Sequence, residues 1–325
     1  MSPPDTAEFP PLPAGYAVRN ATRDDLPRIA ALVAADEIAV LGEVMTTAAD
    51  LAADWEYANW VPERDTWVTL SPDDDLRGYA WCHSPNPHSD PDGMFWTWPD
   101  ESATVVGRHL LARVLKRAAD MATGELERDA PTLGLWCAHD DDSRQRLYSE
   151  AGSIRTRAFF RMTIESDDVS EQPRPPAGIE LRPFRRPEDE RRFHTATEES
   201  FEKHFRWFYE PFDDWRERVF SHPSLDLGLW VVAWAGEEVA GVVKCQSDDA
   251  LGHVDMLAVC KPWRGRGLGL ALLLHAFSLL KARGFATITL GVDAENSTGA
   301  LCLYERAGMT VRQAFDFYEK PLASR

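Results

Sequence analysis

The segment Trp263–Leu274, WRGRGLGLALLL, joins a glycine-rich basic turn directly to an apolar helical pattern, and a strand pattern, VDMLAV, precedes it. Glycines let backbone amides approach a ligand without interference from Cβ atoms. The first turn of a helix leaves N–H groups unpaired at the positive end of the helix dipole. The segment therefore predicts a phosphate or pyrophosphate site, with charge added by Arg264 and Arg266. A glycine-rich turn that binds nothing is the alternative.

The spacing of the glycines separates this turn from two common phosphate-binding loops. The chain contains no G-x-x-x-x-G-K-[ST] motif, which argues against a nucleotide triphosphatase. Gly265, Gly267 and Gly269 are spaced G-x-G-x-G and lie late in their half of the chain. A dinucleotide fingerprint needs G-x-G-x-x-G after the first strand of its domain, so that reading fits poorly.

The chain reads as two copies of one plan. Each half has a strand, a helical region, an apolar hairpin, a long helix, a buried strand and a short helix, and SRQRLYSEAG in the first half matches TGALCLYERAG in the second. Strands mixed with single helices indicate one α/β (α+β) sheet domain per half. The predicted division is a flexible segment 1–15, an N-terminal domain 16–165, a Pro-rich linker 166–178 and a C-terminal domain 179–325.

Composition excludes several classes of function. The 325 residues carry a net charge of −18, which argues against nucleic-acid binding. No apolar stretch is long enough to cross a membrane, and the N-terminus does not resemble a secretory signal. The five cysteines are scattered without a C-x-x-C pair, so we expect neither a metal site nor disulfides. A cytoplasmic protein of undetermined oligomeric state is expected.

The glycine segment resembles motif A of the GCN5-related N-acetyltransferases, R/Q-x-x-G-x-G/A, which reads RGRGLG from Arg264 to Gly269 here. The downstream segment Asp293–Met309, DAENSTGALCLYERAGM, is similar to the family's second signature. The resemblance covers residues 179–322 well and 16–165 weakly. It implies two tandem domains, each with a mixed, mostly antiparallel sheet flanked by helices, as in the mycothiol synthase-like branch of the family. It also implies transfer of an acetyl group from acetyl-CoA to a small-molecule amine, which the acidic composition suggests is cationic.

The resemblance also implies roles for single residues. Loop amides would hold the CoA pyrophosphate, and the preceding strand would pair with the pantetheine arm. The implied cofactor-binding residues are Leu257, Val259, Arg264, Gly265, Arg266, Gly267, Leu268, Gly269 and Asn296.

Direct transfer needs a base for the amine and an acid for the leaving thiolate. The family's usual acid matches Tyr304. The position of the usual glutamate base holds His253, and Asp255 follows two residues later, on the same strand face if the strand is regular. Either of the two could take the proton. A covalent route through Cys260 or Cys302 is less favoured, because neither cysteine has a clear base partner.

The family's acceptor site is lined by the early helices, which points to carboxylates and aromatics suited to a cationic amine. These residues are Glu198, Glu199, Phe201, His204, Trp207, Tyr209 and Phe212. Core packing of the aromatics is the alternative.

The first half has lost the glycine loop, since PDESATVVGRHLL stands where the second has WRGRGLGLALL. We therefore expect one active centre, in the C-terminal copy. A non-catalytic acyl-CoA-binding module and a protein or peptide acetyltransferase remain as other functions.

Overall fold

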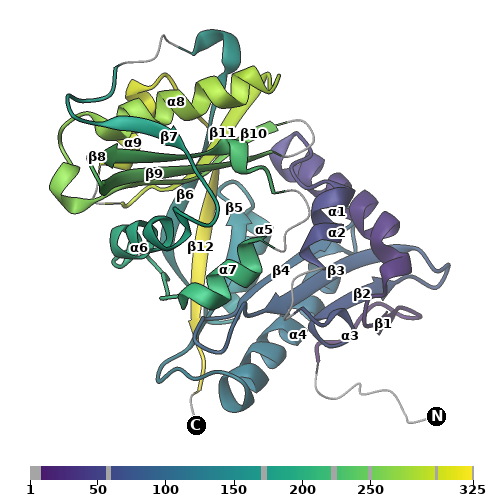
Figure 1. Cartoon of the computed structure of the whole chain (residues 1–325). Coiled ribbons are helices and arrows are strands. Elements are labelled where there is room, and N and C mark those ends of the chain that lie inside the picture. Colours follow the sequence, from purple (N-terminus) through teal and green to yellow (C-terminus); the bar gives the residue numbers. More distant parts are fainter. Residues whose placement is uncertain are drawn as a thin grey trace. The chain divides into compact units, whose positions relative to one another are not determined.

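The computed structural model describes residues 9–55, 60–169, 174–220, 225–247, 251–296 and 299–323. The predicted segments 1–15 and 166–178 fall partly outside these ranges. The chain forms two compact units: unit 1 comprises 1–157 together with 315–325, and unit 2 comprises 158–314 (Figure 1). Within the described ranges, no helix is both long and apolar enough to span a membrane.

Unit 1 contains a mostly antiparallel sheet in the order β1-β2-β3-β4-β5-β12. Only β4 and β5 run parallel, through Asp92↔Gly134 and Gly93↔Leu135. The strands are β1 (Ala17–Arg19), β2 (Thr66–Leu70), β3 (Leu76–His83), β4 (Asp92–Thr97), β5 (Thr132–Ala138) and the end of β12 (Thr310–Pro321). The helices are α1 (Leu26–Leu41), α2 (Ala48–Asp54), α3 (Pro62–Asp65), α4 (Ala103–Gly124) and α5 (Asp142–Glu150).

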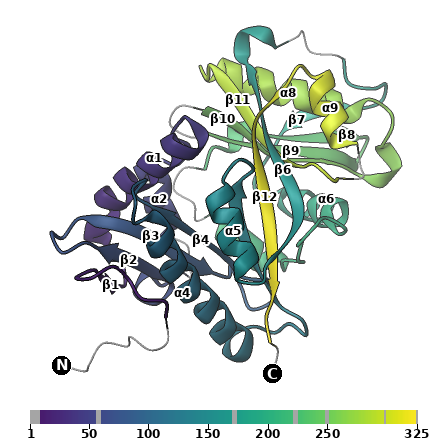
Figure 2. The ribbon, with the colours of Figure 1, turned by 180° about the vertical axis from the view of Figure 1, so that it is seen from behind.

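Strand β3 shows how unit 1 is layered. Ala80 and Cys82 belong to the core cluster that holds Leu110 and Val114 of α4. Tyr79, the residue before Ala80, packs into the cluster of α1 residues instead. Because alternate side chains of a strand point to opposite faces, α4 and α1 cover the two faces of this sheet (Figures 1 and 2).

Unit 2 has the same plan, with the strand order β6-β11-β10-β9-β8-β7. Helix α8 packs against β9 and β10, and α6 also packs against these two strands. The strands are β6 (Ile154–Glu165), β7 (Glu180–Pro183), β8 (Trp230–Ala235), β9 (Glu238–Ser247), β10 (Leu251–Val259) and β11 (Thr287–Asp293). The helices are α6 (Glu190–Phe201), α7 (Phe212–Phe220), α8 (Leu268–Ala282) and α9 (Ala300–Arg306).

The last strand of each copy pairs outside that copy. Strand β6, which ends the first half, pairs with β11 from Phe159 to Glu165. Strand β12, which ends the second half, pairs with β5 from Phe315 to Pro321. The compact units therefore differ from the division expected at 166–178. The prediction that the two sequence copies meet at residues 166–178 stays a prediction.

Two residues at the start of the described chain contact helix α4. The guanidinium carbon of Arg113 lies 4.3 Å from the centre of the Phe9 ring. His109 Nδ1 lies 2.7 Å from the carbonyl oxygen of Pro10. The flexibility of segment 1–15 stays a prediction.

Candidate active site

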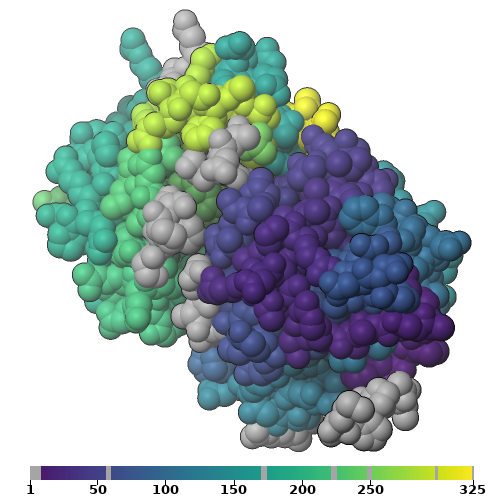
Figure 3. All heavy atoms as spheres, turned by 90° about the vertical axis from the view of Figure 1, so that its right-hand side faces the viewer, coloured from purple at the N-terminus to yellow at the C-terminus, as the bar shows by residue number. Residues whose placement is uncertain are grey.

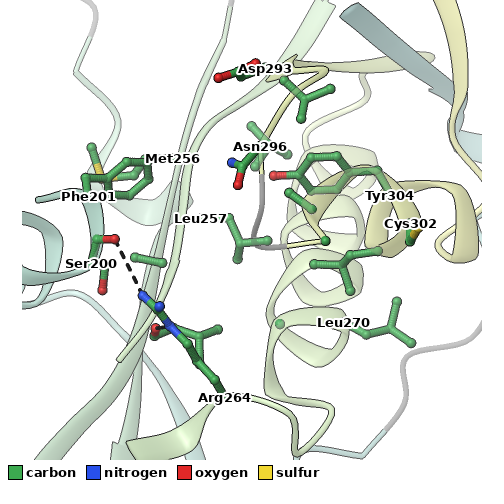
Figure 4. Close-up of a pocket in the computed structure, with 18 of the residues that line it drawn as sticks. Ser200, Phe201, Met256, Leu257, Arg264, Leu270, Asp293, Asn296, Cys302 and Tyr304 are labelled. Atoms are coloured by element: carbon green, nitrogen blue, oxygen red, sulfur yellow. Dashed lines mark hydrogen bonds between the residues drawn. The ribbon is translucent and has the colours of Figure 1, made fainter. Parts of the chain in front are cut away.

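Two strands of unit 2 separate to form a cleft. Parallel pairing of β10 with β11 covers Leu251↔Thr287 to His253↔Thr289 and no later residue. Beyond His253 the strands diverge, and a cavity of about 610 Å³ is lined by residues of both, of α6, of α9 and of the start of α8 (Figure 4). Ligands of open sheets bind at such a separation, because side chains from several elements converge there.

The glycine loop forms one end of this cleft. Gly265 and Gly267 adopt positive φ angles of 73° and 84°, where an L side chain is strained. Gly267 is the N-cap of α8, so the unpaired first N–H groups of a 15-residue helix begin at the cavity wall. A Cβ on Gly269 would lie 3.2 Å from a methyl carbon of Leu303, so this glycine lets α8 approach α9.

The two arginines of the loop have different surroundings. Arg264 lines the cleft, and its Nε donates to the Val259 carbonyl at 2.8 Å while Nη2 donates to that of Ser200 at 3.5 Å. Its guanidinium therefore ties the end of β10 to α6. Arg266 is absent from the lining, and its guanidinium lies 5.1 Å from the centre of the Trp263 ring. The structure brings together all the other expected cofactor residues: Leu257, Val259, Arg264, Gly265, Gly267, Leu268, Gly269 and Asn296.

Tyr304 lies in the same cleft and its ring points towards Asn296 (Figure 4). Burial raises the pKa of its hydroxyl to about 12, so the group is protonated at neutral pH. It therefore has a proton to donate. Cys302 also lines the cleft and is exposed, whereas Cys260 does not line it.

The strand is irregular between the two candidate bases. The pairing of β10 with β9 shifts between Val254 and Met256, so Asp255 is the extra residue of a β-bulge. Period-two alternation is interrupted at a bulge, and bulges are common beside active sites. Asp255 lines the cleft and His253 does not. That the two side chains share a strand face stays a prediction.

Each candidate base has a partner. Asp255 forms an ion pair with Lys244, whose Nζ lies 2.7 Å from Oδ2 of Asp255. His253 Nδ1 lies 2.9 Å from Thr289 Oγ1. Burial lowers the pKa of His253 despite the nearby charge of Asp255, so its imidazole is neutral at pH 7.

The acceptor residues expected from the early helices of the second half divide into two groups. Phe201 and His204 line the cleft, and their rings lie 4.3 Å apart. Burial lowers the pKa of His204, which keeps it neutral. The remaining five do not line the cleft: Glu198, Glu199, Trp207, Tyr209 and Phe212.

Internal contacts account for several of these five. The carboxylate of Glu198 accepts a hydrogen bond from Trp207 Nε1 at 3.2 Å, and burial raises its pKa. Phe212 packs on Trp215 and His194, with ring centres 5.9 and 5.6 Å away. An amphipathic helix has one buried face, and sequence alone does not say whether core or cleft covers it.

Sequence reasoning missed many lining residues of this cleft, and four of them illustrate why. Phe159 was missed because it precedes the expected linker, and the strand pairing of β6 places it in unit 2. Ser200 and Phe205 lie beside residues that the helix pattern did indicate. Met256 lines the cleft because it follows the bulge, which no local sequence signal marks.

The corresponding region of unit 1 lacks both chemical features of the cleft. The start of α4 carries Asp100, whose carboxylate accepts from the Ser102 amide at 2.8 Å, and it would repel a phosphate. A Cβ on Gly107 would lie 2.8 Å from the Phe95 ring, so this glycine serves packing. Tyr148 is fully buried and donates to the Trp136 carbonyl at 2.9 Å. Its hydroxyl is not open to a reacting thiolate.

Known proteins resemble this chain over most of its length. The family model "Acetyltransferase (GNAT) family" matches residues 190–309. A mycothiol acetyltransferase of Geodermatophilus obscurus is 30% identical over 262 residues, covering 78% of this chain and 80% of that protein. One of Thermobispora bispora is 28% identical over 258 residues, covering 77% and 81%.

Solved structures agree with this relationship. A GCN5-related N-acetyltransferase from Sphaerobacter thermophilus has a TM-score of 0.86 at 27% identity and covers 97% of this chain and 98% of its own. A tandem GNAT protein from the clavulanic acid biosynthesis pathway has a TM-score of 0.73 at 15% identity, covering 95% and 99%, and it supports the fold alone. With the glycine loop and Tyr304 in one cleft, these likenesses show that the chain belongs to the GNAT family and is a tandem-domain N-acetyltransferase.

Proposed function

We propose that the cleft of unit 2 transfers an acetyl group from acetyl-CoA directly to a primary amine of a small molecule. The observation that carries the proposal is that a glycine-rich helix start and a protonated tyrosine line one cavity. An acyl-CoA needs the first for its pyrophosphate, and the departing thiolate needs the second for its proton.

The donor would lie along the separated edge of β10. The amides that follow Gly267 at the start of α8 would hold the pyrophosphate, and the backbone of Leu257 and Val259 would flank the pantetheine arm. Arg264 supports this site by fixing the end of β10 through the Val259 carbonyl. Its positive charge also lies near the helix start (Figure 4).

Transfer then needs two proton movements. The amine nitrogen attacks the thioester carbon after losing a proton, which we assign to Asp255 directly or through water, because Asp255 lines the cleft. The carbon–sulfur bond breaks, and the thiolate takes the Tyr304 hydroxyl proton. The neutral imidazole of His253 remains the other candidate base. Because His253 does not line the cleft, a proton from the amine would reach it only through an intervening group.

The acceptor is proposed from the relatives and the charges of the cleft. The relatives that match three quarters of this chain are named mycothiol acetyltransferase, which supports the amine of a mycothiol precursor as the first acceptor to test. Two carboxylates, of Asp255 and Asp293, and two guanidiniums, of Arg264 and Arg306, line the cleft. A cationic ammonium of the acceptor would lie beside the carboxylates. The five unpaired cysteines fit the cytoplasmic location that we propose.

The decisive experiment compares two tyrosines that hold matching positions in the two copies. Tyr304→Phe removes the proposed acid, and we expect kcat to fall by roughly 10²–10⁴-fold with little change in the KM for acetyl-CoA. Tyr148→Phe removes a hydroxyl that only bonds a carbonyl, so activity should stay at the wild-type level. CoA thiol release with the best acceptor of an amine panel is the readout.

The panel also separates the alternatives. Equal activity of Tyr304→Phe and the wild type would refute the acid assignment. Turnover with peptides but with no small amine would favour a protein acetyltransferase. CoA binding without thiol release on any amine would favour a non-catalytic module.

A further inference from the structure

Unit 1 contains a cavity of its own, of about 280 Å³. Its walls come from α1, α2, β3 and β4, and every residue that lines it belongs to unit 1. Helix α1 lies on the face of the molecule shown in Figure 3 (purple). Small-molecule sites usually measure about 300–1,000 Å³, so this cavity suits a compact ligand.

Aromatic rings dominate the lining. Six of the lining residues are aromatic: Trp55, Trp60, Tyr79, Trp81, Trp96 and Phe315. The rings brace one another, since Tyr79 stacks on Trp96 at 5.7 Å and Trp60 lies 5.4 Å from Trp81 between ring centres. Several fixed indole and phenol rings around one space attract organic cations through their quadrupoles.

The charged side chains that line this cavity carry a net negative charge when all of them are ionised. They are three carboxylates, of Asp36, Glu37 and Asp54, and one guanidinium, of Arg144. Two of the carboxylates are already held. Asp36 binds Arg144 Nη2 with both oxygens at 2.7 Å, and Glu37 accepts from the Met45 and Thr46 amides at 2.6 and 2.9 Å.

Asp54 differs from the other two. Within the described ranges its carboxylate has neither a hydrogen bond nor an ion pair. The residue as a whole is exposed, so its carboxylate can be reached from solvent. Partial desolvation of the carboxylate, helped by the charge of Asp50, raises its pKa to about 6. The Nε1 of Trp60, another lining residue, is buried with no acceptor among the described residues.

We propose that this cavity binds a small organic cation, an ammonium group with compact alkyl substituents. The ammonium would lie among the aromatic rings and pair with Asp54. Because unit 1 lacks the glycine loop and its Tyr148 hydroxyl is already bonded, the ligand would be bound there without being acetylated. The site would therefore be a second small-molecule site, separate in its residues from the cleft of unit 2.

The test uses the full-length chain at pH 8, where Asp54 is ionised, and choline as the probe. Its neutral isostere, 3,3-dimethylbutan-1-ol, has the same shape without the charge. By calorimetry and tryptophan fluorescence, we expect choline to bind at one site and the isostere to bind at least about tenfold more weakly.

Variants locate the binding. Asp54→Asn should weaken choline binding by about tenfold or more, whereas Asp129→Asn should not, because Asp129 is exposed in the same unit and does not line the cavity. Trp60→Leu, checked for folding by circular dichroism, should weaken it as well. The proposal is overturned if neither choline nor tetramethylammonium binds, if the isostere binds equally well, or if Asp54→Asn binds as the wild type does. None of these results bears on acetyl transfer in unit 2.

Discussion

Gly267 gives the sharpest test of the donor site, because the chain offers a matched control for it. Its φ of 84° is strained for alanine, and no other atom lies within 4 Å of the Cβ that Gly267→Ala would add. The same holds for Gly236, with a φ of 65°, in the β8–β9 hairpin. Each substitution should therefore lower the free energy of unfolding by about 1–2 kcal/mol.

The two variants should differ in acetyl-CoA binding. Relief of strain at Gly267 displaces the amides at the start of α8. Loss of one hydrogen bond to a charged phosphate costs about 1.5–3 kcal/mol, which corresponds to roughly 10–100-fold in Kd. Gly236 does not line the cleft, so its variant should bind as the wild type does. Calorimetric titration with CoA and urea unfolding measure the two effects. Wild-type affinity in Gly267→Ala, or equal losses in both variants, would refute the loop assignment.

Two further predictions concern Tyr304 and a packing glycine. Burial holds the pKa of Tyr304 near 12, so its hydroxyl stays protonated as pH rises. We therefore expect no fall in kcat due to this group up to about pH 10. A basic limb near pH 10 that disappears in Tyr304→Phe would contradict this. In helix α4, Gly107→Ala should destabilise unit 1 by about 1–3 kcal/mol, because the added Cβ clashes with Phe95. Gly124→Ala has open space around its Cβ and should be neutral or slightly stabilising. If urea unfolding ranks the two variants the other way, the packing role of Gly107 is wrong.

The sequence predicted those features that depend on local pattern. The order of strands and helices follows from apolar periodicity, and the glycines of the loop indicated the turn before α8, where Gly265 and Gly267 adopt positive φ angles. Tyr304 was indicated by the resemblance of its segment to the family's second signature, and its place in the cleft agrees with that resemblance. In each case the decisive information lies within about fifteen residues of chain.

The exchanged strands were not predictable in this way. Strands β6 and β12 each have a clear β pattern, yet pairing depends on which edge is free in three dimensions. The register Phe159↔Asp293 joins residues far apart in the chain. An alternating pattern specifies which face of a strand is buried and leaves its neighbour unspecified.

The bulge at Asp255 was not predictable from the sequence. Counting by two from His253 assumes a regular strand, and a single extra residue in β10 interrupts that regularity. The irregularity follows the point where β10 leaves β11, since the pairing of these two strands ends at His253. The opening of the cleft therefore lies beside the bulge, whose extra residue, Asp255, lines the cleft. Deletion of Asp255 would restore regular pairing, but it would remove the carboxylate and the bulge together. Asp255→Asn keeps the bulge and removes only the proton acceptor. It is therefore the substitution that tests the base assignment.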